Sequence, residues 1–175
     1  MTFTALSVIN PWPWLILRPD VLHPDERAAL RESPARLKDV ENRVDWETPF
    51  RGWALLHASK TRLAKWDWRA AILFAAKRGV DVPLVAMPYG AIVGAMRVDD
   101  CRRGYASPWA VPGANQFVIG AAVPFAEPVV CDGKPRFFRV DEGLKPEPAL
   151  RLRAQLAAAV RAAGLAKCFN LEENA

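Results

Sequence analysis

Gly52-Trp53-Ala54-Leu55-Leu56-His57-Ala58 is a nearly continuous apolar run in a chain of 175 residues. A strand with one wet face alternates polar and apolar side chains, so a run without alternation is typical of a strand that is buried on both faces or closes a barrel. The segment after it predicts a helix with Thr61 as N-cap and Gly79 near its end. The residues at helical spacing are Leu63, Trp66, Ala70, Leu73 and Phe74.

Five other segments have the composition of β-strands. They cover residues 4–9, 37–44, 90–98, 115–123 and 137–140. Gly94 and Gly120 lie within two of these segments, and glycines in strands commonly mark the bends or bulges that curve a barrel. Together with the helices, these strands indicate an α+β fold.

Helices are expected on both sides of this β-rich region. Residues 11–17 have one apolar face, and a broad apolar stripe predicts a C-terminal helix over about residues 147–164. The stripe consists of Leu150, Leu152, Leu156 and Val160. Residues 19–36 are charged and punctuated by prolines, and we interpret them as a surface insertion containing a brief helix near residues 24–30.

Length and composition indicate one globular domain that spans residues 1–175. Hydrophobic residues make up 51% of the chain and charged residues 25%, which excludes disordered and fibrous proteins. No signal-peptide core and no run of about 20 apolar residues is visible, so we expect a cytoplasmic protein with no membrane partner. The formal charge of +5 favours polyanionic partners in a general way.

The cysteine pattern argues against disulfides and metals. Cys101, Cys131 and Cys168 are odd in number and widely spaced, as expected of free thiols in a reducing compartment. His23 and His57 are the only histidines, so the inventory for a zinc site is poor. We expect neither a metal nor a cofactor, and the sequence does not indicate an oligomeric state.

Several short motifs follow one another in a distinctive order. They are Ala5-Leu6-Ser7-Val8, Asn10-Pro11-Trp12, Lys38-Asp39-Val40-Glu41-Asn42-Arg43, Arg51-Gly52, His57-Ala58-Ser59-Lys60, Gly90-Ala91-Ile92-Val93-Gly94, Asp99-Asp100-Cys101, Ser107-Pro108-Trp109 and Pro128-Val129-Val130-Cys131-Asp132-Gly133. In this order the chain resembles ASCH domains over about residues 4–140. The resemblance implies a PUA-like β-barrel flanked by helices, with a cleft beside the strand that carries the family's Gly-x-Lys-x-x-Glu-x-Arg motif.

Lys38, Glu41 and Arg43 hold the charged positions of that motif, and Arg36 stands where the glycine is usual. Arginine and lysine suit a phosphate or a base edge, and a glutamate accepts hydrogen bonds from exocyclic amines and ring N–H groups. In a regular strand Lys38 lies on the face opposite Glu41 and Arg43, so a joint site requires a local irregularity. The alternative is an ion-pair ladder on the surface.

Tryptophans are candidates for stacking on a base. Trp12, Trp46 and Trp109 lie in or beside the loops expected around the cleft, and each is either a stacking or a core residue. Trp109 is the strongest of them because Ser107-Pro108 indicates an exposed loop. The patterns around Trp53, Trp66 and Trp68 are typical of packing residues.

Anion-binding candidates follow the apolar strand. Ser59 and Lys60 precede Thr61, where a helix N-terminus would present free N–H groups. Arg51 belongs to another of the family-like motifs. His57 is either an acid or base near neutrality or, more commonly for such a position, a hydrogen-bonded structural residue.

The residues favour binding of a nucleotide or of single-stranded RNA. The expected contacts are Trp12, Lys38, Glu41, Arg43, Arg51, Ser59, Lys60, Ser107 and Trp109. The alternative is a metal-independent hydrolase, either a ribonuclease or an amidohydrolase of the N4-acetylcytidine type, with Lys38 and Glu41 as catalytic residues. The resemblance implies the latter activity because Lys38 matches the lysine of such family members, although Glu41 replaces their nucleophilic threonine. A third hypothesis is a protein-interaction role, with an apolar patch on the helix around Leu150.

Overall fold

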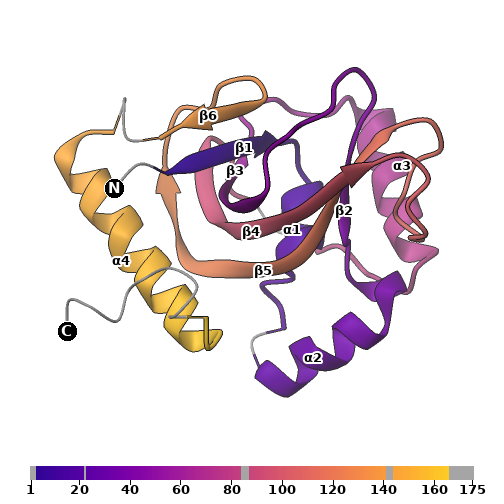
Figure 1. The fold of residues 1–175 in the computed structure, drawn as a ribbon, viewed down its shortest axis with the longest axis horizontal. Coiled ribbons are helices and arrows are strands. Elements are labelled where there is room, and N and C mark those ends of the chain that lie inside the picture. Colours follow the sequence, from indigo (N-terminus) through magenta and orange to yellow (C-terminus); the bar gives the residue numbers. More distant parts are fainter. Residues whose placement is uncertain (1–2, 22, 84–86, 141–143, 166–175) are drawn as a thin grey trace.

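The computed structural model describes residues 3–21, 23–83, 87–140 and 144–165 (Figure 1). The strands are β1 (Thr4–Val8), β2 (Val40–Arg43), β3 (Gly52–Ala58), β4 (Ala91–Arg102), β5 (Asn115–Val130) and β6 (Phe137–Arg139). The helices are α1 (Trp12–Leu17), α2 (Pro24–Glu32), α3 (Lys65–Ala76) and α4 (Pro146–Ala162), with a short 3-10 turn at Pro34–Arg36.

The six strands form one mixed sheet in the order β2-β5-β4-β3-β1-β6. β1 and β3 pair in parallel, and the other neighbouring strands pair antiparallel. Figure 1 shows this sheet curled into a half-barrel, with α3 and α4 on opposite sides of it. The α+β class and the barrel-like sheet flanked by helices are confirmed.

β3 is buried on both faces, as its apolar run predicts. Leu55 packs in a core formed with α4, whereas Leu56 packs in a second core with residues of α1 and β4. Because neighbouring side chains of a strand point to opposite faces, a strand between two cores is apolar at most positions. The predicted bounds of this strand match the observed ones.

Bulges curve the sheet where glycines were expected to do so. The pairing of β4 with β5 shifts between Arg97 and Val98, and Gly120 is left without a partner at that point. A second shift lies beside Gly94, where a Cβ atom would overlap the carbonyl oxygen of Val123. Gly94 therefore allows close approach of the backbone, whereas a Cβ atom at Gly120 would overlap the Asp99 side chain.

Several element boundaries differ from the predicted ones. β4 extends to Arg102 because its backbone pairing continues through polar residues, and β5 extends to Val130 because its end pairs with the start of β4 at Ala91 and Ile92. α3 begins at Lys65 after Ala64, so Thr61 is not its N-cap. The interpretation of Trp66 as a packing residue is wrong, because its side chain is 77% exposed.

Candidate functional site

A buried ion pair joins Lys38 to Glu41. Lys38 Nζ donates to Glu41 Oε2 at 2.9 Å and also to the carbonyl oxygen of Val40. The two side chains are 3% and 8% exposed. The backbone N–H of Lys38 donates to Leu15 of α1 at 3.2 Å, which fixes the approach of the chain to β2.

Arg43 contacts the same carboxylate from the other side. Its Nη2 lies 3.3 Å from Glu41 Oε1 and donates to the carbonyl oxygen of Ser7 at 2.8 Å. The guanidinium also lies over the Trp46 ring, and its Nε is buried without a hydrogen-bond partner among the described residues. Glu41 therefore lies between two cations.

The three side chains converge because Lys38 precedes β2, which begins at Val40. Strict alternation does not apply to a residue outside the strand, so the local irregularity that a joint site requires lies at the strand's start. The burial of Lys38 and Glu41 excludes a surface ion-pair ladder.

A cleft of about 380 Å³ opens above this pair, between β2, α3 and the loop before β5. Its lining is mostly apolar, with Lys38, Glu41, Asn42 and Asp67 as the polar members. The apolar lining consists of Trp12, Leu63, Ala70, Ala71, Phe74, Trp109 and Val111. The size and the few converging polar groups are typical of small-molecule sites.

Aromatic rings form one wall of the cleft. Trp12 contacts Phe74 edge to face at 6.2 Å between centroids, and Phe74 contacts Trp109 at 5.8 Å. Lys38 Nζ lies 5.6 Å from the centroid of the Trp12 ring, within reach of a cation–π interaction. Trp12 is partly exposed and can meet a ligand.

Trp109 and Trp46 do not fulfil the stacking expectation. The loop that carries Trp109 is largely exposed as expected, but the Trp109 side chain is 0% exposed, so the expectation that it stacks on a base is corrected. Its ring is covered by Phe74. Trp46 packs edge to face on Phe117 at 4.9 Å and lies outside the cleft lining.

Asn42 was not expected to belong to the site. Its side-chain amide donates to the carbonyl oxygen of Trp109 at 2.9 Å, and its carbonyl oxygen accepts from the Val111 N–H at 2.9 Å. It thereby fixes the loop before β5 against β2. Asp67 and Phe74 were also missed as site residues, although their spacing in the helical pattern placed them on the side of α3 that carries Ala70.

Arg51, Ser59 and Lys60 lie outside the cleft lining. Arg51 pairs with Asp100 at 3.0 Å, and Lys60 pairs with Asp132 at 2.5 Å on an exposed surface. Ser59 Oγ accepts from the Thr61 N–H at 3.1 Å within a loop. Because α3 begins at Lys65, the expected helix N-terminus is not present beside Ser59 and Lys60.

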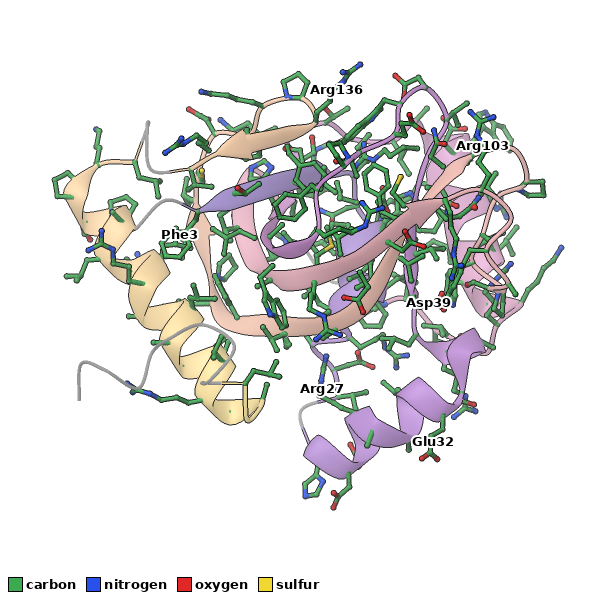
Figure 2. All side chains as sticks on the ribbon, in the orientation of Figure 1. Phe3, Arg27, Glu32, Asp39, Arg103 and Arg136 are labelled. Atoms are coloured by element: carbon green, nitrogen blue, oxygen red, sulfur yellow. The ribbon has the colours of Figure 1, made fainter. Side chains whose placement is uncertain are left out.

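Ser107 also turns away from the cleft. Its hydroxyl donates to Asp39 Oδ1 at 2.5 Å, and burial raises the pKa of Asp39, an effect that the hydrogen bond from Ser107 opposes. Asp39 lines a smaller cavity of about 200 Å³ between α2 and β5, together with Arg27, Lys38 and Tyr105. Figure 2 shows Arg27 reaching from α2 toward the sheet beside this cavity.

His57 occupies a structural position. Its Nε2 lies 3.0 Å from the carbonyl oxygen of Cys131 and must carry the proton of that hydrogen bond, so Nδ1 accepts from Ser7 Oγ at 2.8 Å. The side chain is buried, and burial lowers its pKa. It is not part of the cleft lining.

Within the described ranges, no cluster of three His, Cys, Asp or Glu side chains has the arrangement of a metal site. No helix in those ranges combines the length and apolar character needed to cross a bilayer. In comparisons with known proteins, no family model and no curated protein matches the chain. The function is therefore argued from the cleft residues themselves.

Proposed function

We propose that the cleft receives the base of a nucleotide or of single-stranded RNA, and that the chain is a PUA-like domain of the ASCH type. The observation that carries this proposal is the buried Lys38–Glu41 pair at the base of an aromatic-walled cleft. A binding role explains both the position of the pair and the retention of its charges.

Stability alone does not explain the Lys38–Glu41 pair. Removing two charges from water is costly, and apolar residues of similar volume often stabilise a fold equally well or better. Both groups also retain hydrogen-bonding capacity. Two partners are observed for the three protons of Lys38 Nζ, and each Glu41 oxygen has one observed cationic partner although it can accept twice.

A donor beside an acceptor complements the edge of a nucleobase. Glu41 can accept from an exocyclic amine or ring N–H while Lys38 donates to a neighbouring carbonyl or ring nitrogen. Trp12 and Phe74 supply the aromatic wall, and stacking on such a ring contributes roughly 1–3 kcal/mol per base.

The charges in the cleft favour a base over a phosphate. Lys38 and Arg43 flank the Glu41 carboxylate, and the remaining ionised side chain of the lining is Asp67. A phosphate beside Asp67 would meet a like charge, so we expect the phosphates to lie outside the cleft.

Binding is tested with the double variant Lys38→Met/Glu41→Leu, which removes both charges and keeps similar volumes. We expect at least a tenfold loss of affinity for the nucleotide that the wild type binds best, measured by calorimetry across the common ribonucleoside monophosphates. The matched control is Arg51→Gln/Asp100→Asn, which removes an ion pair outside the cleft and should leave affinity unchanged. The proposal would be refuted if the cleft variant and the control variant bound the nucleotide with equal affinity. It would also be refuted if the wild type bound none of the nucleotides.

Hydrolysis in the same cleft is the second candidate function. The specific observation is the 2.9 Å contact of Lys38 Nζ with Glu41 Oε2, which positions a proton donor and acceptor together without a metal. Incubation with N4-acetylcytidine and with short RNAs tests it, with Lys38→Met/Glu41→Leu as the inactive control. Turnover that depends on the pair would identify an enzyme, whereas binding without product supports the first proposal.

A further inference from the structure

The outward face of α3 carries apolar side chains that are left open to solvent. Trp66 is 77% exposed and Leu73 is 57% exposed. They are seven residues apart, which corresponds to about two turns of helix, and Ala70 lies exposed between them on the same side. These three residues are called the α3 stripe below. A contiguous exposed apolar strip on one helix is typical of an interaction site, unlike single exposed residues.

The α3 stripe continues the wall of the cleft. At about 100° of rotation per residue, three strips follow one another around the helix. The first strip faces the cleft and consists of Asp67, Ala71 and Phe74. The second is the α3 stripe itself. The third is basic and consists of Lys65 and Arg69. Ala70 itself lines the cleft, so a ligand leaving the cleft over α3 meets the stripe next.

α3 and the residue that follows it carry exposed positive charges. Lys65, Arg69 and Lys77 are exposed, and none of them forms an ion pair within the part of the chain that the structure describes. Some exposed cations elsewhere are paired, as Lys60 is with Asp132 at 2.5 Å, whereas Arg153 and Arg161 of α4 have no ion pair among the described residues either. The acidic residue of α3 is Asp67, which faces the cleft.

We propose that the α3 stripe, with Lys65 and Arg69, is a second subsite for single-stranded RNA. One base stacks on Trp66 and the adjoining phosphates contact the two cations. Indole faces stack on any base and flanking cations follow the backbone, which is the usual design of single-strand binding surfaces. The proposal rests on the proposed function, because the strand reaches α3 from the base held in the cleft.

The charge of the surface favours this occupant over a protein. Lys65 and Arg69 lie beside the α3 stripe, Lys77 follows its C-terminal end, and the acidic residue of α3 faces the cleft, so the surface around the stripe is positive. A polyanion gains from all three cations through counterion release.

Chain-length dependence tests the subsite. Fluorescence anisotropy would compare Trp66→Ala with the wild type on RNAs of four and twelve nucleotides, and calorimetry would compare them on a mononucleotide. We expect Trp66→Ala to weaken binding of the twelve-nucleotide RNA by about tenfold, from the loss of one stacked base, and to leave the mononucleotide affinity unchanged. Lys65→Gln/Arg69→Gln should reduce the slope of log affinity against log salt by about 1.4, from two lost phosphate contacts.

Matched controls lie on α4, on the opposite side of the half-barrel (Figure 1). Leu150→Ala removes an exposed apolar side chain, and Arg153→Gln/Arg161→Gln removes two exposed cations. Losses in these controls equal to those on α3 would overturn the proposal. Twelve-nucleotide RNA binding no tighter than the mononucleotide would also overturn it, as would a change in self-association of Trp66→Ala without any change in RNA affinity.

The same measurements separate the two proposals. One outcome is that binding of the twelve-nucleotide RNA depends on Trp66 but not on Lys38 and Glu41, and that no mononucleotide binds. This outcome would refute the proposed cleft site and support the proposed α3 subsite. Mononucleotide binding that depends on the cleft pair, with no gain from longer RNA, would refute α3 and support the cleft. Binding of neither ligand would refute both.

Discussion

Glu41 dominates the electrostatics of the cleft because its carboxylate lies between Lys38 and Arg43. Glu41→Gln leaves both cations without their negative charge, and Lys38 is 3% exposed. Lys38→Met is milder, because Arg43 still contacts the carboxylate at 3.3 Å. We expect Glu41→Gln to lower the free energy of unfolding by about 3–5 kcal/mol and Lys38→Met by about 1–3 kcal/mol, measured by urea denaturation.

The double variant Lys38→Met/Glu41→Leu should be more stable than Glu41→Gln alone. It removes the buried cation together with its partner, and Arg43 keeps its hydrogen bond to Ser7. Double-mutant-cycle analysis of urea midpoints, with Lys38→Met and Glu41→Leu as the single variants, checks the coupling. Additive losses would show that the two side chains do not act as a pair.

His57 gives the fold a dependence on pH. Burial lowers its pKa below the ordinary value of 6.5, so the unfolded chain binds the proton more readily than the folded chain. The stabilisation by neutral His57 is complete above pH 6.5 and is lost as the pH falls below that value toward the lowered folded-state pKa. Unfolding free energies between pH 5 and 8 should therefore rise less steeply with pH in His57→Gln than in the wild type, whereas His23→Gln, at a solvent-exposed histidine, should match the wild type.

At this scale the sequence identifies the charged site but not its surroundings. The motif spacing singles out Lys38, Glu41 and Arg43, and their convergence depends on where β2 begins, which periodicity does not specify. The burial of Trp109 results from contacts with Phe74, a residue 35 positions away in the printed chain. Local context such as Ser107-Pro108 contains no information about that packing.

Among the elements, the bounds of β3 are anticipated better than the start of α3. A change in composition marks the ends of β3, because its largely apolar residues are flanked by Arg51 and Ser59. Its burial on both faces accounts for the lack of polar alternation between them. α3 starts later than Thr61 because Leu63 turns into the cleft and the Arg62 guanidinium stacks on Tyr89 at 4.1 Å, which keeps the chain extended there. Apolar residues occur at helical spacing both on the cleft side of α3 and on its exposed side. Spacing alone therefore did not show that Trp66 is exposed.

Arg27 makes several of the hydrogen bonds that hold the insertion at residues 19–36, and Arg18 contributes others to Asp20 and to the carbonyl oxygen of Arg36. Arg27 of α2 donates to the carbonyl oxygens of Leu17 at 2.9 Å and Ala122 at 3.1 Å, and it also contacts the loop after α1. Arg27→Met removes these bonds but keeps much of the stem. We expect faster hydrogen exchange and proteolysis of residues 19–36 with little change in the rest of the chain, whereas Glu32→Gln on the exposed side of α2 should behave like the wild type.

For the molecule as a whole, the two sides of the sheet differ in what covers them. α4 covers one face through Leu152, Leu156 and Val160, and α3, which carries the stripe and contributes to the cleft lining, lies on the side away from α4 (Figure 1). β3 supplies side chains to both cores, Leu55 toward α4 and Leu56 toward α1. Loss of packing beneath α4 should therefore also destabilise the core on the cleft side of the sheet.

Leu156→Ala tests this coupling between the two faces. Leu156 is 3% exposed, so its truncation leaves a cavity and should cost about 2–5 kcal/mol. Because β3 joins both cores, far-UV circular dichroism and tryptophan fluorescence should still report one transition, shifted together to lower urea. Leu150→Ala, on the exposed side of α4, should change stability by less than about 0.5 kcal/mol. Separate transitions in Leu156→Ala would mean that the cleft side folds independently of α4, and the shared strand would then not couple the two cores.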